Sequence, residues 1–264
     1  MSAKVRDKCG VIGIWSKSSD VSLSLYNALI ALQHRGQESC GITVRGLESG
    51  VWSSEDVKTS LSLSQKERPS GESKGISEDV KTSAAARQDL KTGRPQYPRP
   101  KTGDPRLETH RGMGLVMRAF SEVDLERMKG NAGIGHVRYS TTGVSDARNA
   151  QPFFTDNIAI AYNGNLTNYK SVKMKLESQG IKFETDSDTE VILRVLDNEL
   201  VPPKKGEKER KAQVFGACRK LMGQIEGAYS VAAVTAFGEL IAIRDPLGFK
   251  PFCLGRKGGA HYVS

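Results

Sequence analysis

Cys9 is the residue of this sequence whose type and position most directly suggest covalent chemistry. It begins the apolar run Cys-Gly-Val-Ile-Gly-Ile-Trp at 9–15 and follows only eight residues. A cysteine thiol attacks well only after a base has taken its proton. If residues 1–8 are a propeptide, their removal would free the α-amino group of Cys9, whose pKa of about 7.7–8 suits that task. Position alone equally allows a buried structural cysteine at the start of a strand.

Polar segments follow Cys9 at the ends of predicted strands and helices. In chain order they span residues 32–38, 135–143, 162–166, 185–190 and 244–251. Taken singly, each has a plain structural explanation. Asn163-Gly164 is a common pair in tight turns, and the helix dipole favours an acid such as Asp188 in a first helical turn. Ser187 and Glu190 have the spacing of a capping box.

Taken together and in this order, the segments resemble the glutaminase domain of the class II glutamine amidotransferases. Within that class the chain is most similar to the amidophosphoribosyltransferase family. The resemblance covers residues 9–45 and about 110–258. It implies an α+β fold of the N-terminal-nucleophile (Ntn) hydrolase type, with four layers in the order αββα. The implied reaction is hydrolysis of glutamine to glutamate and ammonia, with the ammonia passed to phosphoribosyl diphosphate to give 5-phosphoribosylamine for purine biosynthesis.

The resemblance also implies roles for the catalytic residues. Cys9 matches the nucleophile that attacks the side-chain amide of glutamine. Asn163 matches the side-chain donor of the oxyanion hole, and Gly164 matches its backbone N–H donor. Such donors act on the charge that develops in the transition state. The α-amine serves as the base in this family, so we expect His34 and His136 to be structural.

A second group matches the residues that hold the substrate. Arg138 matches the guanidinium that binds the α-carboxylate of glutamine, a task suited to its bidentate fork. Asp188 matches the carboxylate that binds the α-ammonium group. Thr141 matches a position that lines the substrate, and Arg35 and Gly36 match a loop that packs beside the nucleophile. Tyr162 departs from the family, which commonly has histidine at this position.

The elements that must position these residues can be predicted from the apolar pattern. We expect strands at 9–15, 40–44, 132–137 and 158–162, and a hairpin of 228–234 with 240–243. Helices are expected at 25–32, 167–179, 188–200 and 211–225. The mixture of strands and helices without strict alternation indicates a layered α+β domain.

Residues 46 to about 107 differ in composition from the rest of the chain. They are rich in Ser, Lys, Glu, Gly and Pro, and the heptapeptide SEDVKTS occurs at both 54–60 and 77–83. Such a composition buries too little apolar surface to offset the entropy of ordering. We therefore expect a flexible insertion in a surface loop of a domain that spans residues 9–258.

The bulk composition limits the partners of the chain. Its 264 residues carry a formal net charge of +9, but the basic residues form no long run and aromatic residues are few, which disfavours nucleic acid. No apolar stretch approaches the ~20 residues that span a bilayer, so no membrane partner is expected. Four cysteines without paired spacing and the lack of a secretory signal favour the cytoplasm.

The resemblance implies partners outside these 264 residues. We expect glutamine as substrate, a phosphoribosyltransferase domain or subunit, of which residues 259–264 are the start, and a homo-oligomer in the complete enzyme. No cofactor is expected in this chain; Mg²⁺ and an iron–sulfur cluster would belong to the transferase part. Two alternatives remain open: the glutaminase domain of another class II enzyme, of the glutamate synthase or glucosamine-6-phosphate synthase type, or a non-catalytic regulatory subunit.

Overall fold

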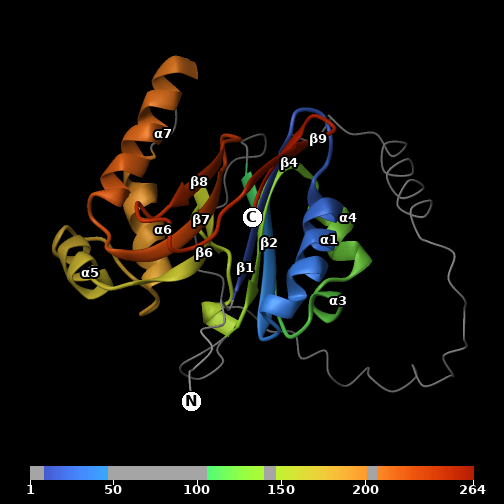
Figure 1. Ribbon diagram of the computed structural model, residues 1–264, viewed down its shortest axis with the longest axis horizontal. Coiled ribbons are helices and arrows are strands. Elements are labelled where there is room, and N and C mark those ends of the chain that lie inside the picture. The colour runs from blue at the N-terminus through green and yellow to red at the C-terminus, as the bar shows by residue number, and fades with distance from the viewer. Residues whose placement is uncertain (1–8, 47–105, 140–146, 201–206) are drawn as a thin grey trace, which may run out of the picture. The chain divides into compact units, whose positions relative to one another are not determined.

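Two antiparallel β-sheets form the centre of the structure, a computed structural model that describes residues 9–46, 106–139, 147–200 and 207–264. The larger sheet has six strands in the order β3-β2-β4-β1-β10-β9, and the smaller has four in the order β5-β6-β7-β8. Helices lie on both outer sides of the sheets: α1, α3 and α4 on one, and α5, α6 and α7 on the other (Figure 1). The predicted α+β fold with αββα layering is confirmed.

The six-stranded sheet and its helices come mostly from the first half of the chain. Its strands are β1 (Gly10–Ser16), β2 (Ser39–Gly46), β3 (Arg106–Met113), β4 (Gly130–Arg138), β9 (Leu254–Lys257) and β10 (Ala260–Val263). The helices over it are α1 (Ser22–Leu32), α3 (Val116–Ala119) and α4 (Glu122–Arg127), and the short 3-10 turn η1 (Gln33–Arg35) follows α1.

The four-stranded sheet comes from the second half. Its strands are β5 (Phe153–Phe154), β6 (Ile158–Leu166), β7 (Gly227–Thr235) and β8 (Leu240–Arg244). Its helices are α5 (Tyr169–Ser178), α6 (Asp188–Glu199) and α7 (Glu207–Met222), and the 3-10 turn η2 (Ala147–Asn149) precedes β5. The predicted hairpin of β7 and β8 is confirmed by their antiparallel register.

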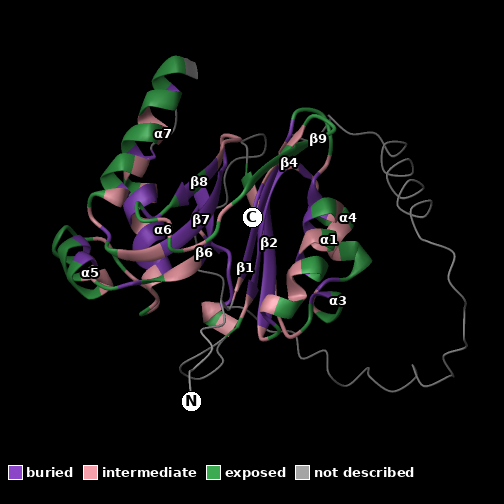
Figure 2. Cartoon of the chain, in the orientation of Figure 1, coloured by how far each residue is buried: buried purple, intermediate pink, exposed green. Residues whose placement is uncertain are grey.

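Three apolar layers hold these elements together, and the central strands β1, β2, β4, β6 and β7 are largely buried on both faces (Figure 2). Along β6, Ile158 and Ile160 pack toward α6, whereas Ala159 and Ala161 pack between the sheets. This two-sided burial explains why the strands read as continuous apolar runs rather than as alternating ones. The small alanine side chains between the sheets allow the two backbones to approach closely.

Several features differ from the sequence expectations. Residues 260–263, expected to begin a transferase region, form β10 and pair with β1 in the six-stranded sheet. Asn163 and Gly164 lie inside β6, because the strand continues to Leu166 rather than ending at Tyr162. The capping box at α6 forms only in part. Ser187 is the N-cap and accepts a hydrogen bond from the Thr189 N–H, but the Glu190 carboxylate binds elsewhere.

The insertion joins two strands that pair with each other. Gly46 of β2 lies opposite Arg106 of β3, so residues 106 and 107 belong to the sheet and the loop between the strands is residues 47–105. The structure of these loop residues lies outside the described ranges. The residues on either side of the loop, Gly46 and Arg106, are paired across the two strands as at the end of a β-hairpin.

Replacing residues 48–104 by a short Gly/Ser linker is therefore expected to leave the fold intact. A hairpin needs only two to five connecting residues, and shortening a loop lowers its closure entropy. The midpoint of thermal unfolding, followed by circular dichroism, should stay the same or rise. The control deletion extends from Val44 to Thr109 and removes paired strand residues, so it should lower the midpoint. Unfolding of the first variant would contradict the expectation.

Within the described residues, none of the helices is long and apolar enough to cross a membrane.

Candidate active site

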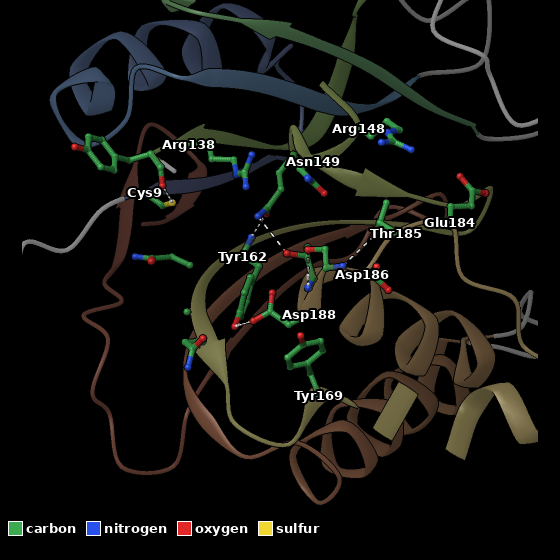
Figure 3. A pocket seen from close by; sticks show the side chains of 17 residues that line it. Cys9, Arg138, Arg148, Asn149, Tyr162, Tyr169, Glu184, Thr185, Asp186 and Asp188 are labelled. Atoms are coloured by element: carbon green, nitrogen blue, oxygen red, sulfur yellow. Dashed lines mark hydrogen bonds between the residues drawn. The ribbon is translucent and has the colours of Figure 1, made fainter. Parts of the chain in front are cut away.

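A pocket of about 570 Å³ lies where the two sheets meet α6, and its lining is mostly polar (Figure 3). Five of the eight residues named from the sequence line it: Cys9, Arg138, Asn163, Gly164 and Asp188. Cys9 precedes β1 and Arg138 ends β4, in the six-stranded sheet. The asparagine and glycine come from β6, in the other sheet, and Asp188 is the first residue of α6. Segments 179 residues apart in the sequence thus meet in one cavity.

Cys9 is half-buried at the pocket wall. Burial raises the pKa of its thiol above the ordinary value, and a contact to the Tyr139 carbonyl and the positive charges of Arg138, Lys250 and Arg35 counter that rise. The Sγ–O distance to Tyr139 is 4.0 Å. A thiol whose pKa is raised stays protonated at neutral pH, so this nucleophile requires a base.

Cys9 also has an unusual backbone conformation. Its φ of 135° makes it the one non-glycine residue with a positive φ within the described ranges. A side chain disfavours this region, and such a conformation typically costs about 1–3 kcal/mol. On its other side the backbone is anchored, because Arg35 Nε donates a hydrogen bond of 2.8 Å to the Cys9 carbonyl.

Arg35 therefore holds the backbone of the nucleophile, Gly36 packs against Arg138, and neither residue lines the pocket. Gly36 lies against the main chain of Arg138, where an added Cβ would stand only 2.5 Å from the Arg138 carbonyl carbon. A larger residue would displace Arg138 from the pocket wall. Thr141, the remaining predicted residue, lies outside the described residues.

Gly164 is required by the close approach of β7. A Cβ at this position would meet the Ala228 carbonyl oxygen at 2.4 Å and the Tyr229 Cα at 2.8 Å. Asn163 and Gly164 lie opposite Ser230 and Tyr229 in the ladder of β6 and β7. The strand pairing thus fixes both residues on the pocket wall, which suits preorganised donors of an oxyanion hole.

Arg138 is oriented by an ion pair. Its Nη1 donates to the Glu38 Oε1 at 3.1 Å, and both side chains are largely buried. The guanidinium carries five N–H donors, and the bond to Glu38 uses one of them, on Nη1. The pair holds a positive charge on the same wall as Cys9, where a substrate carboxylate could bind.

Asp188 is oriented by two donors on the same oxygen. The Tyr162 hydroxyl donates to Oδ2 at 2.7 Å, and the Leu166 N–H donates to it at 3.2 Å. Burial raises the pKa of Asp188, and these hydrogen bonds counter the rise by stabilising the ionised form. A buried carboxylate held in this way is suited to bind an ammonium group.

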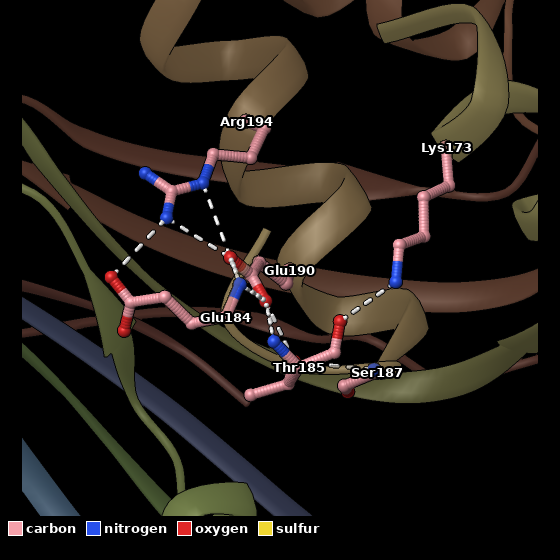
Figure 4. A network of polar contacts seen from close by, with 6 residues as sticks. All are labelled: Lys173, Glu184, Thr185, Ser187, Glu190 and Arg194. Atoms are coloured by element: carbon pink, nitrogen blue, oxygen red, sulfur yellow. Dashed lines mark hydrogen bonds and ion pairs between the residues drawn. The ribbon is translucent and has the colours of Figure 1, made fainter. Parts of the chain in front are cut away.

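The loop before α6 forms another wall of the pocket, and Glu190 holds it in place (Figure 4). The buried Glu190 carboxylate accepts from the Glu184 N–H at 2.9 Å, the Thr185 N–H at 2.7 Å and the Thr185 hydroxyl at 2.7 Å. Arg194 Nη2 neutralises its charge at 3.0 Å. These donors, rather than the N–H of Ser187, satisfy Glu190, which explains the incomplete capping box.

The two histidines named in the sequence analysis do not line the pocket. His136 is fully buried, and burial lowers its pKa to about 3, so its ring is neutral at pH 7. Its Nε2 bonds the Tyr162 carbonyl oxygen at 3.1 Å and so links the two sheets. His34 is exposed to solvent on α1's C-terminal side, where its Nδ1 bonds the Ala31 carbonyl. Both are placed as structural residues.

Sequence reasoning missed several residues that shape the site. Gln151 joins the Tyr162 N–H to the Thr189 hydroxyl, at 2.7 and 3.3 Å. Tyr139 contacts the nucleophile, and Lys250 lies close enough for its charge to act on Cys9. The only signal in the sequence was that Tyr139 and Lys250 fall inside two of the polar segments already noted.

The described residues do not offer a ligand set for a metal or an iron–sulfur cluster. Across the ranges that the structure describes, no three His, Cys, Asp or Glu side chains are grouped so that they could hold a metal ion. Cys40 belongs to the core beneath α1, whereas Cys218 lies on α7 and packs against a different core cluster.

Comparison with known proteins agrees with this geometry. Residues 136–264 match the glutamine amidotransferase domain family. The chain is 34% identical to the amidophosphoribosyltransferase of Methanothermobacter thermautotrophicus, over 99% of this chain and 43% of that protein. It is also 34% identical to the chloroplastic amidophosphoribosyltransferase 1 of Arabidopsis thaliana, over 98% of this chain and 35% of that protein.

Solved structures give the same result. The glutamine phosphoribosylpyrophosphate amidotransferase of B. subtilis matches with a TM-score of 0.61 and 28% identity, over 96% of this chain and 41% of that one. The chain thus spans less than half the length of these relatives. Residues 136–264 thus match the glutamine amidotransferase domain family, and the chain is similar in sequence and in fold to part of the amidophosphoribosyltransferases.

Proposed function

We propose that this chain hydrolyses the side-chain amide of glutamine to glutamate and ammonia. The observation that carries the proposal is the meeting of Cys9, Arg138, Asn163, Gly164 and Asp188 in one pocket. Hydrolysis of an amino acid with an amide side chain requires a nucleophile and oxyanion donors for the amide, a cation for the α-carboxylate and an anion for the α-ammonium group. A regulatory subunit without catalysis would need none of this arrangement.

The chemistry proceeds in two steps. The α-amino group of Cys9 takes the thiol proton, and Sγ attacks the amide carbon to form a tetrahedral intermediate. The Asn163 amide and the Gly164 N–H stabilise its oxyanion. The intermediate collapses to a glutamyl thioester, and the amine returns the proton to the departing ammonia. Water, deprotonated by the same amine, then cleaves the thioester and releases glutamate.

The opposite charges of the pocket orient the substrate. Arg138 binds the α-carboxylate and Asp188 binds the α-ammonium group, so the side-chain amide is directed toward Cys9. Charge-assisted hydrogen bonds of this kind are shorter and stronger than neutral ones. The proposal is tested by incubating the chain with glutamine and measuring glutamate and ammonia in equal amounts. Asparagine serves as the control substrate, because its shorter side chain does not reach Cys9.

We further propose that the ammonia serves a phosphoribosyltransferase domain or subunit, where it would form 5-phosphoribosylamine from phosphoribosyl diphosphate. The similarity to amidophosphoribosyltransferases supports this acceptor over those of glutamate synthase or glucosamine-6-phosphate synthase. Mg²⁺ and any iron–sulfur cluster would act with that transferase part. A homo-oligomeric complete enzyme and a cytoplasmic location remain predictions.

Active protein is expected to begin at Cys9. The φ torsion of 135° exists only while a residue precedes Cys9, so removal of residues 1–8 releases that strain and creates the α-amine. The Arg35 bond to the Cys9 carbonyl would keep the new terminus in place. Intact-mass measurement of active material should show the loss of residues 1–8. Full activity with these residues attached would contradict the role of the amine.

A further inference from the structure

Tyr162 is the one residue of the recognised segments that departs from the family pattern, and it directly contacts the residue assigned to the substrate α-ammonium. We propose that the Tyr162 hydroxyl is a positioning group that sets the selectivity of the site for an α-amino acid, by fixing the carboxylate of Asp188. The inference rests on the proposed glutaminase function and names the group that controls recognition of one end of the substrate.

The backbone of Tyr162 is hydrogen-bonded on both sides and its ring is buried, which fixes the position of its hydroxyl. Its backbone carbonyl accepts from His136 of the facing sheet at 3.1 Å. Its backbone N–H donates to Gln151 Oε1 at 2.7 Å. The side chain itself is 4% exposed, packed in the core between β6 and the helices. Little freedom remains, so the hydroxyl is delivered to a fixed point at the pocket wall.

The carboxylate of Asp188 is fixed by the same contact. The hydroxyl lies 2.7 Å from Oδ2, the length of a strong O–H···O⁻ bond. The Leu166 N–H binds the same oxygen at 3.2 Å, and the backbone N–H groups of Thr189 and of Asp188 itself also stabilise the carboxylate. Among these donors, the Tyr162 hydroxyl is the one that a side chain supplies, and it orients the carboxylate from the side of β6. The donors also favour the ionised form of Asp188, which alone attracts an ammonium group.

Gln151 ties this pair to the start of α6. Its Nε2 donates to the Thr189 hydroxyl at 3.3 Å while its Oε1 holds the Tyr162 N–H. The strand that carries the hydroxyl and the helix that carries the carboxylate are therefore joined by a second bridge. Tyr162 therefore positions Asp188, because its hydroxyl binds the carboxylate directly and its N–H is linked through Gln151 to the helix that carries Asp188.

The test compares two substrates that differ only at the α-amino group. One is glutamine; the other is 4-carbamoylbutanoate, which has the same amide and carboxylate but no amine. Tyr162→Phe is expected to lower kcat/KM for glutamine by roughly 10- to 100-fold, the scale of a hydrogen bond to a charged group, and mainly through KM. Hydrolysis of 4-carbamoylbutanoate should stay unchanged. A merely structural role would reduce both substrates alike, and that result would overturn the proposal.

Further variants place the effect on Asp188. In an Asp188→Asn background, adding Tyr162→Phe should cause no further loss, because the carboxylate that the hydroxyl serves is already gone. Additive losses would overturn the proposal. Tyr229→Phe is the matched control: it removes another buried hydroxyl, one that has no hydrogen-bond partner among the described residues, and should preserve the preference for glutamine.

Tyr162→His keeps a donor at this position and is expected to retain most of the preference for glutamine. Should Tyr162→Phe fail to fold, a folded Tyr162→His variant decides the question, since equal kcat/KM for the two substrates would overturn the proposal. The outcomes also distinguish a failure of the proposed function from a failure of the role of Tyr162. No glutamine hydrolysis by the wild-type chain would contradict the proposed function, whereas wild-type hydrolysis with an unaltered Tyr162→Phe variant would contradict only the role of Tyr162.

Discussion

Cys9→Ala is expected to abolish glutamine hydrolysis. The thioester cannot form without Sγ, and no other described cysteine lines the pocket. Removing a hydrolase nucleophile lowers kcat on the order of 10⁶-fold, which here means a fall to background. The measurement is glutamate release, with labelling by a glutamine-like diazoketone as a second readout. The label should be lost together with activity, and free glutamine should protect the wild-type chain from it.

Cys253→Ala is the matched control for this prediction. Cys253 is a free and exposed cysteine outside the pocket, so a general thiol reagent would reach it easily. Its loss should leave hydrolysis and diazoketone labelling unchanged. Residual hydrolysis above background in Cys9→Ala would refute Cys9 as the nucleophile.

Asn163→Ala is expected to lower kcat by roughly 10²–10³, or about 2.7–4 kcal/mol of transition-state stabilisation, the usual cost of losing one oxyanion donor. The KM for glutamine should change much less, because the amide of Asn163 acts on charge that exists only after attack. Steady-state kinetics with glutamine measure both constants.

The control is Asn198→Ala, which makes the same chemical change on the exposed side of α6. It should leave both constants unchanged. A rise in KM with an unaltered kcat in Asn163→Ala would show that Asn163 binds the ground state of glutamine, and the oxyanion hole would then have to be reassigned.

The sequence predicted the secondary elements well where burial on both faces produced an apolar run. β1, β4, β6 and β7 all have such runs, and α6 has an apolar stripe preceded by a polar cap. The end of β6 was missed, because Asn163, Gly164 and Asn165 are typical of turns. They remain in the strand since β7 pairs with them residue by residue.

The site was predictable as a set of residues but not as a network. The order of the polar segments identified Cys9, Arg138, Asn163, Gly164 and Asp188, and the pocket unites them. The contact of Tyr162 with Asp188 depends on the position of α6 over β6, which no local pattern encodes. The capping-box role predicted for Glu190 was wrong for a similar reason. Its carboxylate accepts hydrogen bonds from three donors in the preceding loop, which the capping-box pattern does not include.

The layer between the two sheets has a consequence for catalysis. Cys9 directly precedes β1 of one sheet and Asn163 lies in β6 of the other, and the spacing between those sheets is set by side chains such as Ala159, Ala161 and Ala232. The distance between the nucleophile and the oxyanion donor therefore depends on the size of alanine side chains that do not contact glutamine. A misplacement near 1 Å can cost about 10²-fold in rate, so one extra methylene in this layer would impair turnover even in a chain that still folds. The alanines of this layer therefore set a catalytic distance as well as contributing to the stability of the fold.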